Sequence, residues 1–208
     1  MLLNYLAKIL VLSVAFLFIV NGRSVAQDGR HSFSVSLLNS PDKLSYHWID
    51  WTDDSSYKYT EDGMYGVGLG YAFQILPFIS AQAKYELAYY NGLEDRDDLR
   101  VNINDKYFLV GLKLHPSRKK IKTELNFDYI FTRSSLYYNV AGERRDGNGE
   151  GWGAEFGVAI GFQFQEIHSV MVETSGRIID TYYSRDISDV KNFSGISTII
   201  KMTYEIEF

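Results

Sequence analysis

The sequence contains no cysteine, only three prolines and a single long apolar run. Without cysteine the chain can form no disulfide, no thiolate nucleophile and no Cys-based metal site. The prolines, Pro41, Pro77 and Pro116, lie between apolar segments, where a missing N–H does not disturb a β-ladder. The formal net charge is −5, which argues against nucleic acid as a partner.

The one apolar run, residues 9–20, lies at the start of the chain. It is much shorter than the roughly 20 residues that a membrane-spanning helix needs. Lys8 precedes it, and the small residues Ser-Val-Ala follow at 24–26. This order predicts a secretory signal peptide over residues 1–26, cleaved after Ala26. Removal of residues 1–26 takes away two basic residues, so the net charge changes from −5 for the whole chain to −7 for the remaining domain, 27–208.

The last segment, residues 194–208, alternates in twos between an apolar and a mostly polar face. The apolar face carries Ile196, Thr198, Ile200, Met202, Tyr204, Ile206 and Phe208. A strand of about 15 residues is far longer than the usual five or six. Its length favours a strand that crosses a membrane, and the alternative is the last strand of a soluble sandwich or lipocalin-like barrel.

Seven earlier segments alternate in the same way. Together the eight predicted strands are residues 31–38, 64–74, 78–90, 106–115, 120–132, 151–165, 167–179 and 194–208. Short and long links alternate strictly between them, as an up-and-down barrel requires. The sequence therefore predicts an all-β fold, an eight-stranded antiparallel up-and-down transmembrane β-barrel preceded by a cleavable signal peptide. Both termini are expected on the side of the short turns, the periplasm.

The polar faces of these strands carry charges of both signs in near balance, which suits a narrow barrel interior of paired charges. The predicted lumen charge network consists of Lys84, Glu86, Lys113, Lys122, Glu124, Asp128, Glu155, Glu173, Arg177, Lys201 and Glu205. Rings gather toward both ends of the apolar faces, as in the two aromatic girdles of outer-membrane barrels. These rings are Tyr65, Tyr89, Tyr129, Phe131 and Trp152 at one end and Phe73, Phe162, Phe164 and Phe208 at the other.

Signal peptide, eight amphipathic strands, alternating links and an aromatic C-terminus resemble the small outer-membrane barrels of Gram-negative bacteria, such as the OmpA transmembrane domain, OmpX and OmpW. The resemblance implies that Tyr204, Ile206 and Phe208 form the signal read by the barrel-assembly machinery. It also implies periplasmic chaperones, outer-membrane lipid and lipopolysaccharide as partners. The expected location is the bacterial outer membrane.

Three functions are consistent with such a barrel. The favoured one is a structural or surface-interaction role of the outer loops, because eight strands enclose only enough space for side chains. Its candidate recognition residues are Tyr46, Trp48, Trp51, Tyr57 and Tyr59, because exposed rings are frequent at contact surfaces. The extracellular ligand is unknown.

The second function is a narrow channel of the OmpW type. A channel for apolar molecules needs an apolar lumen, whereas the inward faces are expected to be charged, with Leu38, Leu109 and Ile199 as apolar exceptions. The third is a lipid A-modifying enzyme, which would use a histidine near the outer leaflet. His47 is the one histidine expected on that side. No enzyme, catalytic residue, cofactor or metal is predicted, and residues 146–150 are expected to form a glycine-rich turn rather than a calcium loop.

Overall fold

The computed structural model describes residues 31–41, 45–51, 56–60, 63–94, 100–118, 120–140, 143–165, 167–183 and 190–208. The predicted signal peptide lies outside these residues, so its cleavage after Ala26 stays a prediction. Within the described ranges there is no helix long and apolar enough to cross a membrane.

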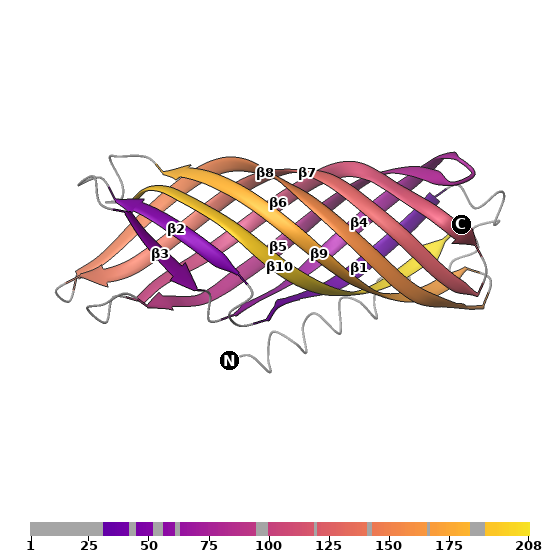
Figure 1. Ribbon diagram of the computed structural model, residues 1–208, viewed down its shortest axis with the longest axis horizontal. Helices are drawn as coiled ribbons and strands as arrows, with labels where there is room; N and C mark the ends of the chain where they lie inside the picture. The colour runs from indigo at the N-terminus through magenta and orange to yellow at the C-terminus, as the bar shows by residue number, and fades with distance from the viewer. Residues whose placement is uncertain are drawn as a thin grey trace.

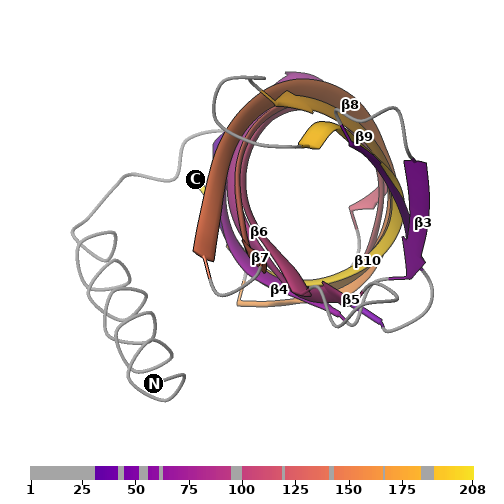
Figure 2. The same ribbon diagram turned by 90° about the vertical axis from the view of Figure 1, so that its left-hand side faces the viewer.

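The described chain forms ten antiparallel strands, and eight of them close into a ring (Figures 1 and 2). The strands are β1 (His31–Ser40), β2 (Tyr46–Trp51), β3 (Ser56–Thr60), β4 (Met64–Leu76), β5 (Ile79–Glu94), β6 (Arg100–Arg118), β7 (Ile121–Val140), β8 (Glu143–Phe164), β9 (His168–Tyr183) and β10 (Val190–Glu207). The ring runs β1-β4-β5-β6-β7-β8-β9-β10 and returns to β1.

The ring closes where the first strand meets the last. β1 pairs with β10 from Ser32 opposite Glu207 to Asn39 opposite Ile200. Two further bonds, His31 N–H to Phe208 O at 3.1 Å and Phe208 N–H to His31 O at 2.9 Å, complete the junction. The eight-stranded antiparallel barrel predicted from the sequence is thereby confirmed. We call the end that holds His31 and Phe208 the terminal end and the opposite end the hairpin end.

β2 and β3 continue the first hairpin rather than adding strands to the ring. The pairing of β1 with β10 ends at Ile200, and β2 then pairs with the same edge of β10 from Ile196 to Val190. In the same way, the β1–β4 pairing ends at Ser40 opposite Met64, and the β2–β3 pairing resumes with Tyr46 opposite Thr60. The predicted loop 39–63 is therefore largely an interrupted extension of a β-hairpin.

Strands at the hairpin end are longer than predicted. β7 and β8 remain paired from Ile121 opposite Phe162 to Val140 opposite Glu143. The predicted long link 133–150 is therefore mostly a paired ribbon, which projects at the left of Figure 1. The predicted glycine-rich turn over residues 146–150 is wrong, because these residues lie within β8, where strand pairing satisfies their backbone.

Alternation in twos separates a lumen from an outer wall. Along β8 and β9, buried and exposed residues alternate over most of their length. The exposed face is apolar: Leu69, Ile121 and Ile160 are each 60% exposed, although large aliphatic side chains usually lie in a core. Backbone groups in a closed ring are paired within the protein, so this wall is suited to lipid.

Candidate functional site: the barrel lumen and the outer rim

A network of buried charges fills the middle of the lumen. Arg177 on β9 donates from Nε to Glu155 on β8 at 2.7 Å and also bonds Glu86 on β5. Lys201 on β10 contacts the same two carboxylates, with Glu86 Oε1 at 2.8 Å. All four side chains are at most 2% exposed. Two cations and two carboxylates therefore neutralise one another, as burial of charge requires.

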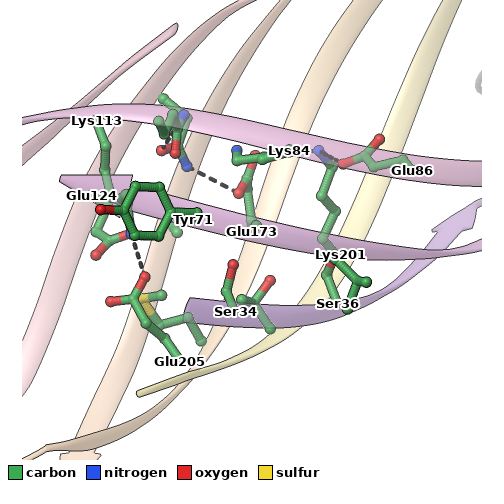
Figure 3. A pocket seen from close by; sticks show the side chains of 18 residues that line it. Ser34, Ser36, Tyr71, Lys84, Glu86, Lys113, Glu124, Glu173, Lys201 and Glu205 are labelled. Atoms are coloured by element: carbon green, nitrogen blue, oxygen red, sulfur yellow. Dashed lines mark hydrogen bonds and ion pairs between the residues drawn. The ribbon is translucent and has the colours of Figure 1, made fainter. Parts of the chain in front are cut away.

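This group bridges opposite walls. β5 and β9 are the third and seventh strands of the ring, so the Arg177–Glu86 pair spans the barrel. Glu86 and Lys201 point toward each other at one side of the cavity drawn in Figure 3. Arg177 also lies over the ring of Tyr107, 4.3 Å from its centroid, which adds a cation–π contact on the side of the hairpin end.

A second group of charges lies toward the terminal end. Lys113 bonds Glu205 and lies 3.5 Å from Glu124 Oε2. Lys122 bonds Glu207 and lies 3.6 Å from Glu205 Oε1. Glu207 was not among the predicted lumen residues, although it continues the inward alternation of Lys201 and Glu205.

The remaining predicted charges, Lys84, Asp128 and Glu173, join the central group, because Glu173 Oε1 lies 4.0 Å from Lys201 Nζ. Lys84 Nζ lies 3.0 Å from Asp128 Oδ2, and Gln82 donates to Asp128 Oδ1 at 2.9 Å. Asn126 donates to Glu173 at 2.9 Å. The structure thus places all eleven residues of the predicted network in the lumen, in a central group and a terminal-end group, and the amides of Gln82 and Asn126 connect Asp128 with Glu173.

The hairpin-end half of the lumen is mostly apolar, although the buried side chains of Asp105 and His47 also lie there. Its buried cluster comprises Leu38, Ile49, Met64, Ala88, Tyr90, Val101, Ile103, Tyr107, Leu109, Ile130, Leu136, Tyr138, Ile179, Tyr183, Val190, Phe193 and Ile199. The expectation that the inward faces are charged with three apolar exceptions is wrong for this half. Eight of its seventeen members, among them Ile49, Leu136 and Phe193, lie on strand extensions that the sequence predicted to be loops.

Little space is left between the charged residues. The cavity in Figure 3, where Lys84, Glu173 and Glu205 point inward, has a volume of about 30 Å³. Such a volume holds about two water molecules. Side chains therefore fill this part of the barrel, as expected for eight strands.

Three polar side chains form a line near the terminal end of the lumen. Ser80 Oγ lies 2.8 Å from His115 Nε2, and His115 Nδ1 lies 3.4 Å from Glu124 Oε1. Hydroxyl, imidazole and carboxylate in this order are the parts of a serine nucleophile with its base. Ser80 is only 5% exposed, and Glu124 also faces Lys113. The arrangement fits a structural network and, in its order, a hydrolytic site.

The other histidines have separate surroundings. His31 and His168 bond tyrosine hydroxyls, Tyr71 at 2.6 Å and Tyr204 at 2.7 Å. His47, the histidine expected in the first outer loop, is fully buried in the lumen and stacks on Phe193 with ring centroids 4.8 Å apart. It therefore does not face the outer surface of the barrel.

The rings of the predicted recognition surface lie on the β2–β3 extension. Tyr46 and Trp48 face outward with 42% and 37% exposure, and His47 and Ile49 alternate with them and face the lumen. Trp51, Tyr57 and Tyr59 lie on the same two strands, but their side chains are outside the described part of the structure.

The three residues of the predicted assembly signal lie beside the closing seam. The Tyr204 hydroxyl bonds His168, and Ile206 is 5% exposed opposite Phe33. Phe208 stacks on Phe33 with ring centroids 5.4 Å apart. In the closed barrel these side chains contact their neighbours along the seam.

A closed ring of long strands, an apolar outer wall and a filled lumen define an outer-membrane type of β-barrel. No protein-family model and no curated protein matches the sequence. Solved structures do match. A major outer membrane protein of Thermus thermophilus is 9% identical with a TM-score of 0.54, covering 86% of this chain and 99% of that one.

The outer membrane protease OmpT of Escherichia coli is also 9% identical, with a TM-score of 0.52, 90% of this chain and 99% of that chain covered. Ail of Yersinia pestis, solved with the heparin analogue sucrose octasulfate, is 9% identical with a TM-score of 0.49 and 85% and 99% coverage. At these identities the likeness concerns the fold. The resemblance to small outer-membrane barrels expected from the sequence is thus confirmed for the architecture.

Proposed function

We propose that the protein is a surface-interaction barrel of the bacterial outer membrane, with both termini in the periplasm and the hairpin end outside. One observation carries the proposal: the lumen is filled, by paired charges in one half and by mostly apolar side chains in the other. Such a barrel offers no wide path for solutes, so its function rests on the parts that leave the membrane. The long ribbons at the hairpin end supply these parts.

The contact surface in this proposal is the outward face of the β2–β3 extension. Tyr46 and Trp48 bring large apolar area at low entropic cost, as at many interfaces. Their strand, β2, is hydrogen-bonded to β10 on one side and to β3 on the other, so the positions of the two rings are fixed before binding. A pre-positioned surface loses less entropy on binding.

The test combines conductance with binding. In planar bilayers the protein should open no stable pore. Cells or proteoliposomes that carry Tyr46→Ser/Trp48→Ser should lose at least tenfold in binding to a panel of matrix proteins, glycans and phage. The matched control is Trp152→Ser, which removes an exposed ring from the lipid-facing wall. Equal binding by both variants, or a stable pore in the wild type, would refute the proposal.

A second candidate function rests on the Ser80–His115–Glu124 line. In an ester hydrolase, His115 Nε2 would take the hydroxyl proton of Ser80 as Oγ attacks the carbonyl, and Glu124 would orient the imidazole. A fluorophosphonate probe tests this directly. Labelling of the wild type that Ser80→Ala abolishes and Ser169→Ala preserves would support an enzyme. No labelling of the folded protein would leave the three residues a structural network.

A further inference from the structure

A groove of about 540 Å³ lies on the outer wall where β5, β6, β7 and β8 run side by side. Its lining consists of Tyr85, Lys106, Phe108, Phe131, Thr132, Arg133, Glu150 and Gly151. The long side chains of this set are exposed, so the groove opens away from the lumen. It is therefore distinct from both halves of the barrel interior.

Two cations stand next to each other on the side of this groove that faces the hairpin end. Lys106 on β6 and Arg133 on β7 are direct cross-strand partners. Like charges in this position repel each other and destabilise a strand pair unless an anion lies between them. Arg133 Nε has a partner, Glu150 Oε1 at 3.0 Å, whereas Lys106 forms no ion pair among the described residues. The three side chains carry a net positive charge.

A row of rings lies directly beside the cations, nearer the middle of the wall. Tyr85, Phe108 and Phe131 are consecutive cross-strand partners, one outward position away from Leu87, Lys106 and Arg133. They are 44–49% exposed. Two residues along a strand separate the rows by roughly 7 Å. The groove is thus cationic on one side and aromatic on the other, a combination that suits an anionic headgroup with apolar chains.

We propose that this groove binds a phosphorylated lipid of the surrounding leaflet. Its phosphate lies between Lys106 Nζ and the free N–H groups of Arg133, and its acyl chains lie on Tyr85, Phe108 and Phe131. Arginine and lysine together match phosphate well, because guanidinium offers several donors and ammonium a compact charge. The bound anion would also remove the repulsion between the two cations. The inference is independent of the role of β2 and β3.

Native mass spectrometry of the detergent-solubilised barrel tests the proposal with three probes: lipid A, its phosphate-free counterpart and inorganic phosphate. The wild type should retain lipid A, and Lys106→Gln/Arg133→Gln should bind it at least tenfold more weakly. The control Arg144→Gln/Arg145→Gln removes the same charge from the β7–β8 ribbon and should bind normally. Lys106→Gln alone serves if the double variant does not fold.

Each other outcome overturns the proposal in a recognisable way. Equal retention by wild type and the groove variant would show that the groove is not the site. Equal binding of the phosphate-free lipid would show that the rings act without the cations. Full competition by millimolar inorganic phosphate would show a simple anion site with no part for the acyl chains. Each arm uses the whole folded barrel.

Discussion

Removal of the Arg177 guanidinium is the sharpest test of the lumen network. Arg177→Met keeps an unbranched chain of similar length but deletes the bonds to Glu86 and Glu155. The central group then holds two carboxylates and one cation, Lys201. A fully buried group that was neutral acquires one uncompensated negative charge.

The expected cost follows from that charge. Breaking a buried ion pair by removing one partner costs about 3–5 kcal/mol. Lys201 still contacts both carboxylates, so we expect a loss of about 3 kcal/mol, at the lower end of that range. Adding Glu155→Gln leaves one carboxylate, Glu86, with one cation and should restore at least half of the loss. The surface variant Arg145→Met, whose partner Glu143 is 78% exposed, should cost at most about 1 kcal/mol.

Urea unfolding of the barrel in lipid vesicles measures these differences in stability. The folded fraction at each urea concentration is read from an unboiled SDS gel, on which folded and unfolded protein migrate differently. The order of stability should be wild type, Arg145→Met, the double variant and then Arg177→Met. If Arg177→Met unfolds together with Arg145→Met, the network contributes nothing measurable. If Arg177→Met/Glu155→Gln is the least stable of the four, the balance of charges in the lumen does not determine the stability of the barrel.

Three further results are expected. Unboiled protein should migrate differently from boiled protein on an SDS gel, because a closed barrel has no free strand edge; identical migration would contradict closure. Leu125→Arg should cost about 2–4 kcal/mol in vesicle unfolding by placing a charge in lipid, whereas Ser135→Arg, beyond the aromatic rings of the same strand face, should cost at most about 1 kcal/mol; equal effects would mean that the wall is misassigned. Gly111→Ala places a Cβ against the Phe127 carbonyl oxygen and should lower the yield of folded barrel, whereas the added Cβ of Gly176→Ala meets nothing within 4 Å and that variant should fold normally. Normal folding of both variants would count against the close strand contact at Gly111.

The sequence was sufficient for the architecture and for the direction of the side chains. A strand has a period of two, so a single apolar position such as Leu125 determines the face of every residue around it. Glu155 and Arg177 are assigned to the lumen in this way. The alternation of short and long links determines which strands are neighbours, because an up-and-down barrel leaves no other order.

The pairing of charges could not be predicted in the same way. Arg177 meets Glu86 across the lumen, and the sequence carries no information on contacts between opposite walls without the exact stagger of the ring. The apolar half was missed for a different reason. Alternation continues through Leu136 and Tyr138, but polar residues between them suggested a loop. If the predicted strands had been continued past the aromatic residues for as long as the alternation lasts, Leu136 and Tyr138 would have been assigned to the lumen.

The central ion group also constrains how the barrel can form. Glu86 lies on the third strand of the ring and Arg177 on the seventh, so their side chains meet only when the sheet curls shut. Until then Glu86 faces water on a half-open sheet, and Arg177 can reach only its direct cross-strand partner, Glu155. Closure removes the water from Glu86 and forms its bonds to Arg177 and Lys201 together, which makes a partly curled intermediate costly. A barrel of this kind should therefore assemble in a steep, concerted transition, with the open sheet kept wet on its inner face.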